Sequence, residues 1–374
     1  MYTKKLAMPL VNMMGGNPDS PLRIILIKNL NLKITNSGKD GDKIPMPVLT
    51  NNKILPLDSK IELNKDDMKC APGFNFTNGS CMPVIIINEL VKAYNKYYPD
   101  DIIPTVDDNI DTFYISEYKK FLISEMKKRF KGDQKDWVNE KFAQSMNKDL
   151  KHMLSKDVFR PKGPKKQFEW MSSLDMNDVM RQYEHYYPDF KYLGSVPIDF
   201  DDIDFYNIKN INYNELIKNG KTKFGMIINN QTHSQGGQHW FCLYFNLISG
   251  DIFFVDSANS KPMDAVNNYV EKIKKFLKSK DIEAEYKINT VEHQQGNSEC
   301  GVYSMYFILR FLKTGDFEKV TSIRVPDEKI NEARKIFFSA LGNWEDKDNK
   351  DETDNDSGNE TDDDSGNETD DESE

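Results

Sequence analysis

Cysteine and histidine are scarce in this sequence, which has four cysteines and five histidines in 374 residues. Cys70, Cys81, Cys242 and Cys300 are too few and too scattered for the framework of a small secreted disulfide protein. No apolar run approaches the length of a membrane span, and Pro9 interrupts the short apolar stretch near the N-terminus. We therefore expect a soluble protein in a reducing compartment, with no membrane span.

No cluster of metal-ligating residues stands out along the chain. Cys70 and Cys81 bracket a turn-rich segment, CAPGFNFTNGSC. A paired-thiol metal site needs two more ligands, and no neighbouring Cys or His offers them. We interpret this segment as a small turn module, and we expect neither a metal ion nor another cofactor.

The formal net charge of −10 comes from the C-terminal end of the chain. Residues 345–374 hold 16 acidic residues and two lysines, so the remainder carries a charge of +4. Residues 351–374 are three copies of an eight-residue unit, DETDNDSG, NETDDDSG and NETDDESE, with no apolar residue able to join a core. We expect residues 344–374 to form a disordered acidic repeat tail.

Two segments precede the part of the chain with the densest apolar patterning. Residues 1–84 have short apolar pieces and no sustained period, which predicts an irregular N-terminal arm. Residues 85–167 have apolar residues three and four apart, which predicts a helical extension. From Lys119 to Lys166 this extension has 15 Lys/Arg against six Asp/Glu. Such a surface is able to meet nucleic acid or an acidic partner, although ordinary solvated helix faces are the simpler reading, because no nucleic-acid motif accompanies the charge.

Residues 168–343 alternate helical and strand-like patterns and predict a mixed α+β domain. The segments KFGMIINN, HWFCLYFNL and DIFFVDS are short, aromatic and β-rich, and Ser249-Gly250 joins the last two as a hairpin. A helix is expected from about Pro262, followed by a strand, AEYKINTV. A second, apolar helix is expected to open near Cys300 and to close before Gly315.

Three residues of this domain form a candidate catalytic set. His239 begins one strand of the predicted hairpin and Asp256 ends the other, so both lie at the same end of it. Cys300 completes the set if its helix packs beneath that end of the sheet, because a helix N-terminus lowers the pKa of a thiol. Each residue alone is more often structural: a strand His is usually packed, a strand-end Asp is usually a turn residue, and a buried Cys is usually inert.

The polar loop before Cys300 supplies the remaining groups that acyl transfer needs. Gln294, six residues earlier, offers a side-chain N–H donor for a tetrahedral oxyanion, together with the backbone N–H of Cys300. Its neighbour Gln295 is the alternative donor. Gly301 is expected to leave room for a substrate backbone.

The combination of these motifs resembles the adenain and SUMO-specific protease family. The resemblance lies in GQHWFCLYFN, Asp256-Ser257 and QQGNSECGVYSMYFI, and FEWMSSLDMNDVMRQYEHYYPDFKYLGSVPIDF is similar to the segment that precedes the triad in the viral branch. That branch contains the polyprotein-processing proteases of large nucleocytoplasmic DNA viruses. The resemblance implies a papain-like-superfamily core, with a central mixed sheet, flanking helices and the nucleophile at a helix N-terminus.

The resemblance also implies a role for each motif residue. His239 is then the general base, Asp256 the orienting carboxylate, Cys300 the nucleophile and Gln294 the oxyanion donor. The resemblance further suggests that Trp240 lines a narrow channel for a Gly-Gly substrate, and that Trp170 matches an upstream substrate-binding tryptophan.

Three functions remain open at this point. The resemblance favours a cysteine endopeptidase that cleaves after Gly-Gly in viral structural polyproteins during virion maturation, acting in the virion and the host cytoplasm. A deconjugating protease acting on host SUMO or ubiquitin-like proteins would use the same chemistry. The third alternative is a catalytically silent binding module, against which the intact triad and its glutamine argue.

The acidic tail and the basic extension lead to a first prediction. If the tail competes with nucleic acid for the basic region, deleting residues 345–374 will increase DNA binding at low salt, because opposite charges attract most strongly when ionic strength is low. Cleavage of a short peptide should not change. Filter-binding or fluorescence-anisotropy titrations decide this, and equal DNA affinity with and without the tail would leave it a solubilising role alone.

Overall fold

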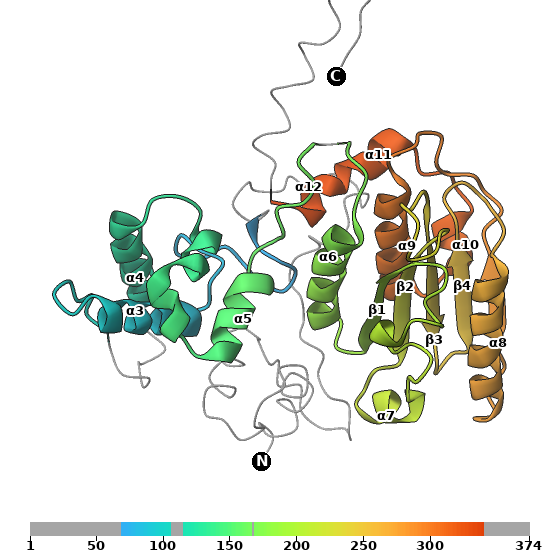
Figure 1. The fold of residues 1–374 in the computed structure, drawn as a ribbon, viewed down its shortest axis with the longest axis horizontal. Helices are drawn as coiled ribbons and strands as arrows, with labels where there is room; N and C mark the ends of the chain where they lie inside the picture. The colour runs from blue at the N-terminus through green and yellow to red at the C-terminus, as the bar shows by residue number, and fades with distance from the viewer. Residues whose placement is uncertain (1–68, 106–114, 167, 340–374) are drawn as a thin grey trace, which may run out of the picture. The chain divides into compact units, whose positions relative to one another are not determined.

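The structure is a computed structural model that describes residues 69–105, 115–166 and 168–339. The first 68 residues of the expected arm and the whole expected tail, 344–374, lie outside the described residues. Figure 1 shows a helical N-terminal region and a sheet-containing region flanked by helices, as the sequence predicts. None of the helices within the described ranges combines the length and the apolar character needed to cross a membrane.

Between residues 69 and 166, the described part of the N-terminal region contains the α-helices α3 (Val84–Tyr97), α4 (Ile115–Arg129) and α5 (Lys148–Lys156). They bury a core of their own, in which Trp137 and Phe142 are almost fully enclosed. These two aromatic residues lie in short 3₁₀ helices, η2 (Gln134–Asn139) and η3 (Lys141–Ser145). The helical pattern of this stretch is therefore divided between two 3₁₀ helices and one α-helix. The α-helix begins only after Asn147, whose side chain caps it by accepting the N–H groups of two following residues.

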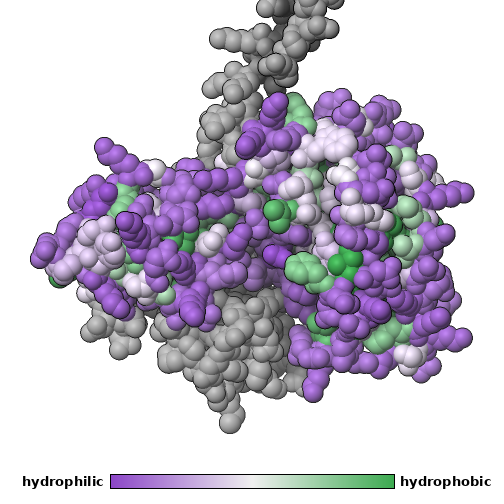
Figure 2. Space-filling model, in the orientation of Figure 1, coloured by the Kyte–Doolittle hydropathy of each residue, from purple (hydrophilic) through white to green (hydrophobic). Residues whose placement is uncertain are grey.

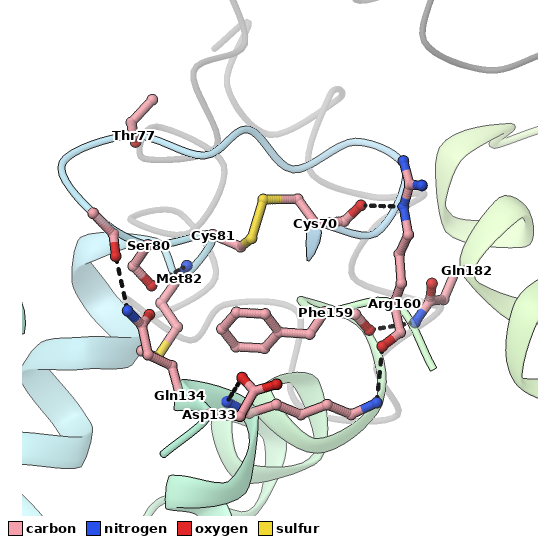
Figure 3. The surroundings of a disulfide bond; sticks show 12 residues. Cys70, Thr77, Ser80, Cys81, Met82, Asp133, Gln134, Phe159, Arg160 and Gln182 are labelled. Carbon is pink, nitrogen blue, oxygen red and sulfur yellow. Dashed lines mark hydrogen bonds between the residues drawn. A yellow bond between two sulfur atoms is a disulfide. The ribbon is translucent and has the colours of Figure 1, made fainter. Parts of the chain in front are cut away.

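A disulfide joins Cys70 and Cys81 in the turn module that precedes α3 (Figure 3). The turns are evident from the sequence, whereas this bond is seen only in the folded chain. Arg160 donates from Nε to the Cys70 carbonyl (2.8 Å), and Cys70 and Phe159 form a β-bridge. The module is thus attached to residues 158–160, although about ninety positions separate the two segments in the sequence.

The sheet has five strands in the order β1-β2-β3-β4-β5. They are β1 (Phe190–Val196), β2 (Lys223–Asn229), β3 (Trp240–Asn246), β4 (Asp251–Val255) and β5 (Glu285–Ile288). The β2–β3 and β3–β4 pairs are antiparallel, whereas β1 and β5 pair in parallel at the two edges. This mixed sheet confirms the predicted fold class. The strand β1 is not among the strands predicted from the sequence.

Helices cover both faces of the sheet (Figure 1). On one face, α8 (Asp264–Lys278) buries Val266, Val270 and Ile273 against the strands. On the other face lie α9 (Cys300–Thr314) and α6 (Ser173–Tyr186). Burial of both faces explains why the central strands read as nearly continuous apolar runs instead of alternating ones. On the face drawn in Figure 2, hydrophilic residues predominate and apolar residues form small, scattered patches.

The chain after α9 forms three short helices: α10 (Phe317–Thr321), α11 (Asp327–Glu332) and α12 (Arg334–Phe337). A short α7 (Tyr213–Lys218) and a 3₁₀ turn, η4 (Asp204–Tyr206), lie between β1 and β2. The helix α6 is attached to the N-terminal region through Gln182, whose Nε2 donates to the carbonyls of Lys156 and Phe159 (2.7 and 2.9 Å).

The disulfide leads to a prediction about stability. Replacing Cys70 and Cys81 together by alanine should lower the free energy of unfolding of the N-terminal region by about 2–4 kcal/mol, because the crosslink restricts the unfolded chain. Chemical denaturation followed by tryptophan fluorescence measures the change. A reductant should destabilise the wild type and leave the double variant unaffected. Equal sensitivity of the two proteins to reductant would contradict the prediction.

Candidate active site

His239 and Asp256 meet at one end of the β3–β4 hairpin. His239 immediately precedes β3 and Asp256 immediately follows β4, and the antiparallel register places Cys242 opposite Val255. The His239 imidazole Nε2 and the Asp256 carboxylate Oδ1 are 2.7 Å apart. The hairpin that the sequence predicts therefore brings these two residues into direct contact.

Surrounding groups hold the Asp256 carboxylate in place. Asp256 is almost fully buried, and its Oδ1 also accepts the backbone N–H of Ala258 (2.8 Å). Asn289, directly after β5, accepts the Asp256 backbone N–H with Oδ1 (3.0 Å) and donates from Nδ2 to the Asp256 carbonyl (2.8 Å). Because these contacts fix the backbone and one carboxylate oxygen, the imidazole has a rigid partner that selects its orientation.

Cys300 is the first residue of α9, so its thiol lies at the positive end of a fifteen-residue helix. It is buried and it forms no disulfide. Burial alone would lower the pKa of His239. The hydrogen bonds to Asp256 and to Cys300 outweigh burial and raise that pKa from 6.5 to about 10. The imidazole is thus held between a carboxylate and a thiol, and its charged form is favoured at neutral pH.

Gln294 has a fixed side-chain amide. Ser257 donates from Oγ to its Oε1 (2.7 Å), and its Nε2 donates to the carbonyl of Gly296 (3.0 Å). An amide has two N–H donors, and one of them remains after the bond to Gly296. Gln294 is buried, whereas Gln295 is exposed. This geometry favours Gln294 over Gln295 as the donor for an oxyanion.

Gly301 has a different role from the one expected. It is buried, and a Cβ at this position would lie 3.1 Å from Met176 Sδ and 3.3 Å from Met171 Cβ. Its missing side chain therefore admits the methionines at the start of α6, and the expectation that it makes room for a substrate backbone is wrong. Trp240 Cδ1 lies 3.8 Å from the same point, which puts this indole beside the first turn of α9.

Trp170 lies just before α6 and is half exposed. Its neighbour Met171 packs against Gly301, so Trp170 belongs to the chain segment that reaches the start of α9, while Trp240 lies directly beside that turn. Sequence reasoning missed Ser257, Asn289 and Met171. The Asp256-Ser257 pair marks Ser257 in the sequence, but nothing local marks Asn289, because its role depends on the pairing of β4 with β5.

The described residues contain no group of three or more His, Cys, Asp or Glu side chains able to hold a metal ion. The side chains of the site supply a thiol at a helix start, an imidazole that contacts it, a carboxylate behind the imidazole and an amide donor. This is the arrangement of a cysteine hydrolase, in which the imidazole activates the thiol and the amide stabilises an oxyanion.

Comparison with known proteins agrees with this class. Residues 215–341 match the model of the Ulp1 protease family, C-terminal catalytic domain, and they include all four residues of the candidate site. A putative thiol protease of Acanthamoeba polyphaga mimivirus is 31% identical over 279 residues, which cover 72% of this chain and 92% of the relative. The chain therefore belongs to the Ulp1 protease family and is a cysteine protease.

Further relatives and solved structures are more distant. A cysteine protease of African swine fever virus is 23% identical over 53% of this chain and 77% of its own length. A crystal structure of the African swine fever virus protease superposes with a TM-score of 0.49 at 18% identity, covering 63% of this chain and 93% of that chain. The Ulp1 protease domain in complex with Smt3, the yeast orthologue of SUMO, has a TM-score of 0.32 at 15% identity, covering 47% and 78%.

The raised pKa of His239 predicts the alkaline limit of activity. The charged His239 imidazolium stabilises the folded protein fully below pH 6.5, and this contribution is lost as the pH rises through about 10. The value of kcat/KM should fall over the same alkaline range, because His239 then no longer carries the proton. Asp256→Asn removes the charge that holds the proton and should move this limb about 1–3 units lower. Rates measured from pH 6 to 11 show the shift.

The two unpaired thiols provide a control for this prediction. Burial raises the pKa of Cys242 in the middle of β3, so iodoacetamide at neutral pH should label Cys300 and spare Cys242. Mass spectrometry of the labelled peptides identifies the site. Preferential labelling of Cys242, or an alkaline limb that stays in place in Asp256→Asn, would contradict the assignment.

Proposed function

We propose that His239, Asp256, Cys300 and Gln294 carry out peptide hydrolysis. The contact of His239 with both Asp256 and Cys300 is the observation that supports this most strongly. The Cys300 thiolate attacks the carbonyl carbon of the scissile bond, and the oxygen becomes an oxyanion facing the Gln294 amide and the Cys300 backbone N–H. The His239 imidazolium gives its proton to the departing amine.

The second half of the reaction uses the same groups. The first half leaves an acyl group on Cys300 Sγ as a thioester and His239 as a neutral imidazole. His239 then removes a proton from water, and the resulting hydroxide attacks the thioester carbonyl. A second tetrahedral intermediate collapses to release the carboxylic acid product, and the thiolate and the imidazolium are restored.

We propose that the bond cleaved follows Gly-Gly in a viral structural polyprotein, and that cleavage takes place in the virion and the host cytoplasm. The viral origin of the relatives supports this setting. The mimivirus relative matches 279 residues, far more than the catalytic-domain match at 215–341, so the similarity also includes sequence outside the catalytic domain. Trp240 lies beside the first turn of α9, and the half-exposed Trp170 precedes Met171, which packs against the same turn; these positions support a role for both indoles in binding substrate residues without side chains.

Deconjugation is the second candidate. Some of the African swine fever virus relatives are described as SUMO-1 cysteine proteases. The same catalytic groups would serve both reactions. The two functions differ in what is recognised beyond the diglycine: a folded ubiquitin-like protein in deconjugation, and an extended polyprotein segment in processing.

A paired cleavage assay tests the substrate proposal. The full chain is incubated separately with a SUMO precursor and with a viral polyprotein fragment that contains Gly-Gly, and products are identified by intact mass. We expect cleavage of the polyprotein fragment at least tenfold faster. Cys300→Ser should remove cleavage of both substrates and Cys242→Ser should retain most of it. Faster processing of the SUMO precursor would establish deconjugation instead, and no cleavage of either substrate would refute both specificities.

A further inference from the structure

The loop from Gln294 to Glu299, called here the oxyanion loop, is held from the side by α11. Asp327, the first residue of α11, accepts with Oδ2 the backbone N–H groups of Gln295 (3.0 Å) and Gly296 (2.9 Å). Its Oδ1 accepts the hydroxyl of Tyr303 in α9 (2.8 Å). One carboxylate therefore connects the loop to the helix that carries the thiol.

A buried arginine holds the other end of the oxyanion loop. Arg334, the first residue of α12, has no exposed surface. Its Nη2 donates to the carbonyl of Ser298 (2.9 Å), two residues before Cys300, and its Nη1 donates to the carbonyl of Glu169 (2.9 Å), next to Trp170. The guanidinium thus joins the approach to the nucleophile to the segment before α6.

Further polar contacts complete this arrangement. Arg334 donates from Nε to Asn331 Oδ1 (2.8 Å), and Asn331 donates from Nδ2 to Glu299 Oε1 (3.1 Å). Burial lowers the pKa of Arg334 to about 10, with partial compensation from the charges of Glu299 and Cys300, so the guanidinium is charged at neutral pH. Burying a charge is costly unless its donors are hydrogen-bonded, and here three N–H groups of the guanidinium have acceptors while the negative charge of Glu299 offsets part of the cost.

The position of the oxyanion loop determines where the Gln294 amide points. Its Nε2 donates to the Gly296 carbonyl, and Gly296 is held by Asp327. If the 295–296 peptide moved, the Gln294 amide would lose one of its two anchors and keep only the bond from Ser257. A misplacement of about 1 Å in such a group costs about a hundredfold in rate.

We propose that Asp327 and Arg334 are positioning residues that together clamp the oxyanion loop in the geometry needed to stabilise the tetrahedral intermediate. The inference rests on the proposed role of Gln294. The clamp acts on the acyl-transfer steps, in which a negative oxygen develops. Its hydrogen bonds to the loop reach backbone atoms and not the Cys300 thiol or the His239 imidazole, so the nucleophile itself stays in place when they are lost.

This distinction gives a readout that a merely structural role would not produce. Alkylation of Cys300 by iodoacetamide requires the thiolate but forms no oxyanion, whereas hydrolysis requires both. Asp327→Ala should lower kcat by about tenfold or more, with KM and the alkylation rate each within about twofold of wild type. Asp327→Asn keeps an oxygen able to accept the loop N–H groups and should retain more activity than Asp327→Ala.

Two other variants serve as a control and as a reference for the effect of Asp327→Ala. Glu328→Ala, in the same first turn of α11 but exposed, is the matched control and should leave kcat unchanged. Gln294→Ala is the reference for a lost oxyanion donor, with kcat expected to fall about a hundredfold and alkylation preserved. Hydrolysis is measured on a Gly-Gly peptide amide and, in parallel, on an activated glycine ester that makes no demand on the longer substrate sequence.

Arg334→Lys keeps the positive charge but loses the planar set of N–H donors that binds both the Glu169 and the Ser298 carbonyls. It should lower kcat and leave the alkylation rate unchanged. It supplies the measurement if Asp327→Ala does not fold, as judged by its melting temperature.

The proposal is overturned if kcat in the Asp327 and Arg334 variants stays within twofold of wild type, or if the alkylation rate falls by the same factor as kcat. If Gln294→Ala itself retains its kcat, the proposed role of Gln294 fails and the clamp with it. If only the Gly-Gly peptide resists the wild type, the substrate proposal fails while the ester still tests the clamp.

Discussion

The burial of α9 is the constraint on which the active site depends. Twelve of its fifteen residues are buried, so the helix has no face to present to water and must lie between the sheet and its neighbours. Packing of Phe311 against Tyr244 and Phe253 fixes α9 on the strands of the hairpin. Its first residue consequently stops near the strand ends, where His239 and Asp256 lie. The packing of α9 against the sheet thus sets the distance between the Cys300 thiol and the His239 imidazole.

The polar groups of the site come from chain segments that the sheet brings to a common edge. The β3–β4 hairpin presents His239 and Asp256, and the parallel pairing of β4 with β5 delivers Asn289 to the Asp256 backbone. Ser257, one residue after the carboxylate, reaches the Gln294 amide. The adjacent residues Asp256 and Ser257 therefore orient two different catalytic groups: Asp256 orients the His239 base and Ser257 orients the Gln294 oxyanion donor. The backbone N–H and carbonyl of Asp256 lie beyond the paired part of β4, and the Asn289 side chain forms the hydrogen bonds that a neighbouring strand would otherwise supply.

Much of this organisation could be predicted from the sequence, because catalytic groups sit where elements begin and end. The hairpin turn at Ser249-Gly250, the apolar strands and the α9 pattern are local signals, and together they place His239 and Asp256 correctly. The strand β1 is hard to recognise in the sequence because Gly194 and Ser195 interrupt its apolar and aromatic residues and weaken its β character. The pattern near Trp137 does not distinguish 3₁₀ helix from α-helix, because the spacing of apolar residues does not show where a cap ends one helix and begins the next.

What the sequence could not predict depends on contacts between distant positions. Nothing in the pattern around Asp327 distinguishes it from Glu328 beside it, yet only the first accepts backbone N–H groups from the oxyanion loop. Arg334 lies in a stretch that reads as an ordinary charged helix, and its burial follows from the packing of α12 against residues more than thirty positions away. Catalytic side chains must be of particular types at particular element ends, so local patterns reveal them. Supporting side chains need only reach the right backbone atom, and many residue types and positions meet that demand, so the folded chain is required to find them.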